Sequence, residues 1–395
     1  VEAVAFDAGG EVLGRDLLWV NEGGGSFRVR IVEPGPEETG SRESPRVGAI
    51  DVAAEISAPP DARVSRVDFY WNATLVASRF APPFRQPVVV PAGAPQGFVR
   101  VVARLDDGAL AEDVVFLNSP GTAERVDVNL VEMYVSVTDG DGRPVPGLGS
   151  EDFRVYEEGE AREIATFSDA RSLPLTVGLA IDSSASMFVK LPSVGLAAAG
   201  FVRDSLEGDD RAFVVGFGGE PRLTQETTAD DARLIRAIAG LRADGQTAVW
   251  ESIVYSLVQL QGAPGKKALI LYTDGADEDE DFSYRTTLRF AREVGVPIYF
   301  ILTNNEIVRT GGKALGVRSF LGRVRGLAEA VGGRIYLVRS GEDLSAVYRE
   351  IGDELRSQYL LTYYSEDLPE ATFRRVRVEA VQPGLEVRTI AGYYR

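Results

Sequence analysis

The chain of 395 residues is strongly acidic and contains neither histidine nor cysteine. Its formal net charge of −17 argues against nucleic acid or an anionic membrane as a partner, because both select basic surfaces. The missing residue types exclude disulfides, haem, iron–sulfur centres, zinc sites with His or Cys ligands, and nucleophiles activated by histidine. The length predicts two to four domains, and no apolar run is long enough to span a bilayer.

The first third of the chain has the pattern of short strands separated by turns. Residues 1–33 contain a strand, a glycine turn and a second strand, and a similar pattern recurs towards the end of 46–118, which is a repeat signal. Segments 68–72, 83–84 and 101–108 resemble bacterial immunoglobulin-like modules of secreted proteins. We therefore predict an immunoglobulin-like β-sandwich over 46–118, and interpret 1–33 as the last strands of a truncated preceding module.

After a polar linker over 33–45, two further β regions flank a mixed segment. A β lead-in covers 125–170, and a β tail covers 358–395. The predicted strands are 131–137, 153–156 and 164–167 in the lead-in and 359–363, 373–381 and 385–393 in the tail. We expect lead-in and tail to pair into one small β-sandwich.

Between these regions, residues 171–357 alternate strands and helices, as a doubly wound, Rossmann-like α/β fold requires. Residues 222–224 could add a short antiparallel edge strand. The predicted strands are 175–181, 212–217, 268–273, 297–302 and 334–338, and the predicted helices are 190–206, 230–242, 249–261, 284–294, 316–331 and 342–357.

Polar residues follow two of the apolar strands. Asp182, Ser184 and Ser186 come directly after strand 175–181, and Asp274 follows strand 268–273, while Thr247 stands in a glycine-containing loop. Parallel strands end at the same sheet edge, where α/β proteins bind ligands. Hard oxygen ligands suit Mg²⁺, Mn²⁺ or Ca²⁺. Asp182 alone could merely cap a helix; the three separated elements together favour the metal.

Asp-x-Ser-x-Ser, a loop threonine and a strand-end Asp-Gly, in this order, resemble the metal-ion-dependent adhesion site of the von Willebrand factor A family. The resemblance covers about 171–357, and segment 137–148 and the chain's last residues are similar to a bacterial secreted subgroup. It implies that the five residues of the preceding paragraph hold Mg²⁺, with Mn²⁺ or Ca²⁺ as alternatives. One coordination position stays open for an Asp or Glu of a protein partner. Ala185 stands where the family often has Gly, and its methyl group is no ligand.

The resemblance implies a binding module rather than an enzyme. We predict a metal-dependent adhesion or assembly module of a secreted or cell-surface bacterial protein, with the periplasm as another possible location. The alternative is a structural protein that forms filaments by strand exchange through residues 1–33. A Mg²⁺-dependent phosphoryl-transfer hydrolase with Asp182 as nucleophile is disfavoured, because Ser184 stands where such enzymes usually carry a second acid.

Three other segments have weaker signals. The acidic run 277–281 is either a solvated loop or a weak second cation site, and the loop 304–316 should lie on the same rim as the metal. Segment 262–267 lacks the spacing of a phosphate loop and precedes a strand, so we reject that reading. Trp250 could pack under the threonine loop.

Overall fold

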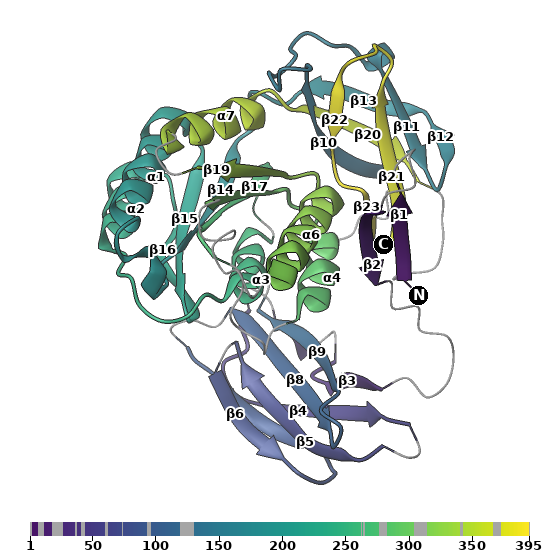
Figure 1. The fold of residues 1–395 in the computed structure, drawn as a ribbon, viewed down its shortest axis with the longest axis vertical. Coiled ribbons are helices and arrows are strands. Elements are labelled where there is room, and N and C mark those ends of the chain that lie inside the picture. Colours follow the sequence, from purple (N-terminus) through teal and green to yellow (C-terminus); the bar gives the residue numbers. More distant parts are fainter. Residues whose placement is uncertain are drawn as a thin grey trace. The chain divides into compact units, whose positions relative to one another are not determined.

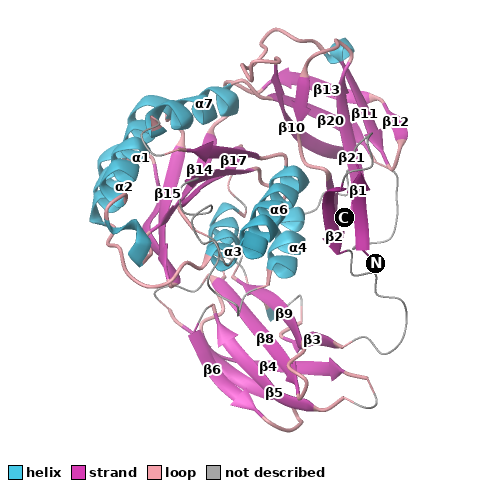
Figure 2. Cartoon of the chain, viewed as in Figure 1, coloured by secondary structure: helices cyan, strands magenta, loops and turns pink. Residues whose placement is uncertain are grey.

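The structure is a computed structural model, and the chain divides into two compact units, 1–40 with 44–117, and 118–395. Figure 1 shows the fold with its element labels. Within the described residues, α-helices occur only between strands β14 (Leu175–Asp182) and β20 (Tyr359–Tyr364), and the short helix beside β13 in Figure 2 is the 3₁₀ turn Ser150–Asp152. The described residues, of which 2–6, 12–17 and 314–319 are described by backbone alone, are 2–6, 12–17, 27–35, 38–40, 44–59, 62–72, 74–92, 96–118, 130–261, 263, 265–275, 283–303, 314–339, 343–365 and 373–394.

The first unit contains an antiparallel sandwich of two sheets, one ordered β3-β4-β7 and the other β6-β5-β8-β9. Its core is made by inward-facing aliphatic and aromatic residues such as Val52, Phe69 and Val101. The β-sandwich predicted here is therefore observed, and its immunoglobulin-like character stays a prediction. The strands are β3 (Arg28–Glu33), β4 (Gly48–Ser57), β5 (Val64–Trp71), β6 (Thr74–Arg79), β7 (Arg85–Val90), β8 (Gly97–Leu105) and β9 (Leu110–Leu117).

The sandwich begins earlier than predicted, because β3 lies inside the segment 1–33 that we assigned to a preceding module. Its Val29 and Ile31 are buried in the core of the sandwich, and β3 pairs antiparallel with β4. The backbone N–H of Ile31 also donates to the Asp113 carboxylate of β9, at 2.9 Å. The assignment of 1–33 to another module is wrong for this strand. The remaining strands, β1 (Glu2–Phe6) and β2 (Val12–Leu17), pair with each other in a separate sheet.

The second unit contains the small β-sandwich that we expected from lead-in and tail. Its sheets, β13-β20-β10-β22 and β12-β11-β21-β23, each combine strands from both segments. The predicted tail strand 385–393 is two short strands in different sheets, since β22 pairs with β10 and β23 with β21. The strands are β10 (Leu130–Thr138), β11 (Phe153–Glu157), β12 (Glu160–Arg162), β13 (Ile164–Asp169), β20 (Tyr359–Tyr364), β21 (Phe373–Ala380), β22 (Glu386–Arg388) and β23 (Gly392–Tyr394).

Between lead-in and tail lies a six-stranded sheet ordered β16-β15-β14-β17-β18-β19. All strands run parallel except the edge strand β16, which is antiparallel and longer than predicted. All five predicted parallel strands and six predicted helices are present. With the edge strand β16 included, the elements are β14 (Leu175–Asp182), β15 (Arg211–Gly218), β16 (Glu220–Thr228), β17 (Lys266–Thr273), β18 (Ile298–Thr303), β19 (Arg334–Val338), α1 (Leu191–Ser205), α2 (Asp231–Gly240), α3 (Val249–Leu260), α4 (Tyr284–Val294), α6 (Ala314–Val331) and α7 (Leu344–Arg356).

Helices cover both faces of this sheet, as in a doubly wound fold (Figure 1). Leu179 and Ile181 of β14 share one core with Phe201 of α1 and Ile351 of α7. Helices α3, α4 and α6 lie on the other face. Every residue of β14 is buried, which is why its sequence is a continuous apolar run rather than an alternation. No helix among the described residues has the length and apolar character to cross a membrane.

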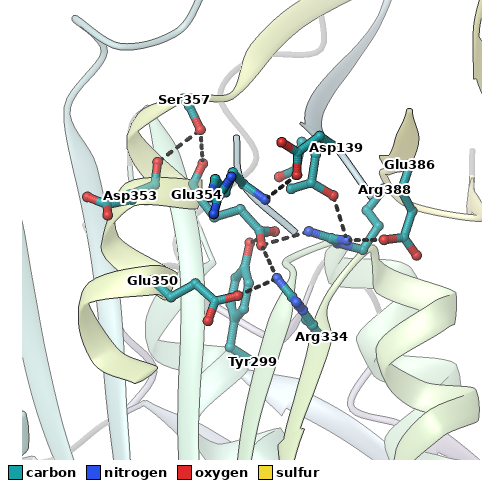
Figure 3. Close-up of polar contacts among 12 residues, drawn as sticks. Asp139, Tyr299, Arg334, Glu350, Asp353, Glu354, Ser357, Glu386 and Arg388 are labelled. Carbon is teal, nitrogen blue, oxygen red and sulfur yellow. Dashed lines mark hydrogen bonds and ion pairs between the residues drawn. The ribbon is translucent and has the colours of Figure 1, made fainter. Parts of the chain in front are cut away.

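A polar cluster joins α7 to the small β-sandwich (Figure 3). The buried carboxylate of Glu354 accepts hydrogen bonds from the Tyr299 hydroxyl of β18, at 2.9 Å, and from Arg388 of β22, at 2.7 Å. Arg334 of β19 lies between Glu354, at 3.6 Å, and Glu350, at 2.7 Å. Burial and the adjacent Glu354 raise the pKa of Tyr299, so its hydroxyl stays a donor. Two arginines and one hydroxyl thus compensate the buried carboxylate that ties the two substructures together.

Candidate functional site

The carboxyl end of β14 positions the first predicted ligand, Asp182, which is fully buried. Its Oδ1 accepts the backbone N–H of Ser184 at 2.8 Å, and its Oδ2 accepts the Thr273 hydroxyl of the neighbouring strand β17 at 2.6 Å. The first bond turns the chain sharply after the strand, as aspartate side chains do in turns. A short 3₁₀ turn over Ala185–Phe188 follows, and it presents Ser186 at the surface.

Ser186 connects the two strand ends. Its hydroxyl donates to Oδ1 of Asp274 at 2.8 Å and lies 3.0 Å from the hydroxyl of Ser184. Asp274 directly follows β17 and is fully buried. Its second oxygen, Oδ2, accepts the ammonium of Lys190 at 2.6 Å. Residues 88 positions apart in the sequence are therefore joined in one hydrogen-bonded group.

The loop that carries Thr247 lies against the turn after β14. The N–H of Ala185 donates to the carbonyl of Gly245 at 3.0 Å, and the N–H of Asp244 donates to the carbonyl of Ser183 at 2.8 Å. Gly218 permits this approach, because a Cβ there would come within 2.3 Å of the Ser183 carbonyl. The Thr247 side chain is buried, and its Oγ1 lies 3.9 Å from the position that a Cβ on the glycine after Asp274 would take. The structure thus brings all five predicted residues to one edge of the sheet.

The electrostatics of the site are those of two buried carboxylates with one nearby cation. Burial raises the pKa of Asp182, the charge of Asp274 raises it further, and hydrogen bonds from Thr273 and Ser184 oppose this. Lys190 compensates Asp274 directly. Sequence analysis missed Lys190, although one signal was present: it precedes helix α1, and a cation is unfavourable at a helix N-terminus unless something else holds it.

The donor set fits a hard divalent cation. The hydroxyls of Ser184 and Ser186 and the Asp274 carboxylate form one hydrogen-bonded group at this edge, to which the buried Asp182 and Thr247 can add two more oxygen ligands. The sequence contains no His or Cys that would favour a softer metal. In the described part of the chain, no group of three or more Asp and Glu side chains is arranged to hold a metal, so a cation at this edge would need the hydroxyls as ligands. The predicted acidic run 277–281 and residues 304–313 of the predicted rim loop lie outside the described residues.

The packing of Trp250 under the threonine loop stays a prediction. Trp250 is buried at the start of α3, where its ring packs on Tyr284 and Phe320, with centroid distances of 5.1 and 5.6 Å. It thus anchors α3 to α4 and α6.

Lys266, in the segment rejected as a phosphate loop, begins β17 and donates to the Leu355 carbonyl of α7 at 2.8 Å. Lys266 is fully buried, and its hydrogen bond links β17 to α7, so its role is structural.

No protein-family model matches the sequence. The protein sll0103 of Synechocystis sp. is 35% identical over 118 residues, which are 28% of this chain and 27% of that protein. The chain thus spans about a quarter of the length of this curated relative.

Among solved structures, similar chains include the von Willebrand factor type A protein of Catenulispora acidiphila, with 15% identity, a TM-score of 0.39, and coverage of 69% of this chain and 76% of that one. BatB of Bacteroides thetaiotaomicron has 18% identity, a TM-score of 0.35, and coverage of 46% and 100%. The PilB minor pilin of Streptococcus sanguinis has 12% identity, a TM-score of 0.39, and coverage of 84% and 93%. Solved von Willebrand factor A domains thus resemble this chain. The likeness concerns the fold.

Proposed function

We propose that the chain is a metal-dependent protein-binding module, in which Asp182, Ser184, Ser186, Thr247 and Asp274 hold a divalent cation. The observation that carries the proposal is the bridge made by Ser186, whose hydroxyl lies between the Ser184 hydroxyl and the Asp274 carboxylate. Mg²⁺ is the proposed ion, with Mn²⁺ or Ca²⁺ as alternatives. The setting that we propose is the surface or exterior of a bacterial cell, where an acidic chain without cysteine suits an adhesion or assembly role.

The chemistry of the residues supports binding rather than catalysis. Hydroxyls contribute oxygen without negative charge, so the two carboxylates leave a bound cation electron-poor. A cation held in this way takes an Asp or Glu of a protein partner at its open position. Hydrogen bonds within the chain hold the two carboxylates in place: the Ser184 N–H donates to Asp182, and the Ser186 hydroxyl donates to Asp274. Nothing in the arrangement requires a general base.

Isothermal titration with MgCl₂ tests the site through Thr247. Thr247→Val replaces the hydroxyl by a methyl group of similar shape, and we expect a loss of Mg²⁺ affinity of about tenfold or more, since even outer-shell partners are worth that much. Thr247→Ser keeps the hydroxyl and should bind within a few-fold of wild type. Thr166→Val in β13 is the matched control, because that hydroxyl bonds Thr362 inside the small β-sandwich. Equal binding by all variants would contradict the site.

The proposed partner chemistry is tested with peptide pairs that differ only in Asp against Asn, or Glu against Gln. We expect acidic members to bind in Mg²⁺ and to lose binding when EDTA replaces the metal. Retention of the same peptides under both conditions would show that capture does not use a cation. Binding of amide members equal to that of acidic ones would show that it does not use a carboxylate.

A further inference from the structure

We propose that Lys190 is a tethered competitor of the divalent cation, which occupies the Asp274 carboxylate and thereby sets the metal affinity of the site. The inference rests on the proposed function, because it assigns a regulator to the same site. None of the sequence motifs that point to the metal includes this residue.

The first argument is the geometry around Asp274. Its Oδ2 lies 2.6 Å from the Lys190 ammonium, and its Oδ1 accepts the Ser186 hydroxyl at 2.8 Å. The carboxylate is fully buried, and a buried charge is costly unless it is paired. The ammonium therefore performs for Asp274 the compensation that a bound divalent cation performs for the same carboxylate. The ammonium and the divalent cation therefore compete for the same carboxylate, and binding of one lowers the occupancy of the other.

The second argument is the placement of Lys190 in the chain. It stands at the N-terminal boundary of α1, where its backbone carbonyl accepts the N–H groups of Ser193 and Val194 at 3.0 and 3.1 Å, and its own N–H donates to Met187. The backbone is thus fixed. The side chain is 28% exposed, and its four methylenes let the ammonium move towards water without a change in the fold. Exchange of the lysine for a metal ion needs only a rotamer change.

The third argument concerns charge. An ammonium that stays within a few ångströms of a divalent cation repels it, and one that moves away must first give up its bond to Asp274. Both effects weaken metal binding. The second does so because only the molecules whose ammonium has left Asp274 can accept the ion. A neighbouring unit charge changes the affinity of a buried carboxylate for a proton by about tenfold or more, and we expect a comparable effect on a metal ion.

The test is titration of the full chain with MgCl₂ at fixed ionic strength, with Lys190→Met, Lys190→Gln and Lys190→Arg. The two neutral variants should bind Mg²⁺ about tenfold more tightly than wild type, and Lys190→Arg should bind like wild type or more weakly. Thermal unfolding is the second readout: without metal, Lys190→Met should melt below wild type, and added Mg²⁺ should raise its melting temperature more than that of wild type.

The outcomes separate the two proposals. If wild type binds Mg²⁺ and both neutral variants bind it equally or more weakly, the lysine is no competitor and the metal site stands. If neither wild type nor any variant binds Mg²⁺, Mn²⁺ or Ca²⁺, the proposed function fails and this inference fails with it. Lys190→Gln keeps a hydrogen-bond donor beside Asp274, so Mg²⁺ binding can still be measured with this neutral variant if Lys190→Met does not fold.

Discussion

Arg374→Met is expected to lower the free energy of unfolding of the small β-sandwich by about 3–5 kcal/mol, because it leaves a buried carboxylate without its cation. Arg374 in β21 and Glu157 in β11 are each 1% exposed and form a direct ion pair. Glu157 also accepts the hydroxyls of Ser365, at 3.0 Å, and Tyr393, at 3.2 Å. These groups come from strands and loops of both segments that flank the α/β part, so the pair holds lead-in and tail together.

The exposed arginine of the same strand supplies the matched control. Arg377→Met removes a pair with Glu379 whose partners are 61% and 43% exposed, and such pairs contribute about 1 kcal/mol or less. Urea denaturation combined with hydrogen exchange of β11 and β21 follows this sandwich separately from the rest of the chain. The double variant Glu157→Gln/Arg374→Met should recover most of the lost stability, because no buried charge remains. Equal losses for Arg374→Met and Arg377→Met would overturn the argument.

The same pair makes the stability of the small β-sandwich depend on pH. Burial alone would raise the pKa of Glu157, but the polar groups of Tyr363, Ser365 and Arg374, together with the arginine charge, outweigh it and lower the pKa below its usual value. A carboxyl whose pKa is lower in the folded state stabilises the fold above its unfolded pKa, and this contribution is lost as pH falls through the folded value. The sandwich should therefore lose stability in acid, and Glu157→Gln/Arg374→Met should lose less.

Elements with a strong local signal could be predicted from the sequence, and contacts between distant residues could not. The buried run of β14 and the periodic helix α7 are visible in the residues themselves. Strands of three residues, such as β12 and β22, are too short to show a period. Strand β3 looked like part of an earlier module because its partner follows only after a polar linker.

The candidate site shows the same division. Its five oxygen-bearing residues stand at strand ends or in a glycine loop, which are positions that sequence patterns reveal. Lys190 escaped notice because its partner Asp274 is 84 residues away and only the fold brings the two together. That the two carboxylates lie at one sheet edge was predictable from the sequence, but the ion pair of Lys190 with Asp274 was not.

Asp182→Asn is expected to have opposite effects on stability and on binding. Without metal the variant should be more stable than wild type, because burial raises the pKa of Asp182 and makes its ionised form a cost to the folded state. A carboxyl with a raised folded pKa stabilises the fold at low pH, and this contribution is lost as pH rises through the folded value. The gain from the amide should therefore be present at neutral pH and vanish in acid.

The amide fits the local hydrogen bonds. Its oxygen can accept the Ser184 N–H in place of Oδ1, and its NH₂ can donate to the Thr273 hydroxyl. The single proton of that hydroxyl, which Asp182 accepts in wild type, can then go to the Gly275 carbonyl 3.2 Å away. The exchange thus removes the charge and keeps the turn after β14. Mg²⁺ affinity should fall about 100-fold or more, beyond the loss that removal of an outer-shell partner causes.

Thermal unfolding with and without Mg²⁺ measures both effects in one series. At a metal concentration 100 times the dissociation constant, wild type should gain about 2.7 kcal/mol from binding, and Asp182→Asn should gain almost nothing. Without metal the order should reverse, with the variant melting above wild type. A variant that is less stable without metal would show that the Asp182 charge is compensated within the chain, and a variant that still gains from Mg²⁺ would place the ion elsewhere. If both results are observed, the charge of Asp182 lowers the stability of the metal-free fold, and binding of a cation restores it, which is the compromise between stability and function expected of a binding site.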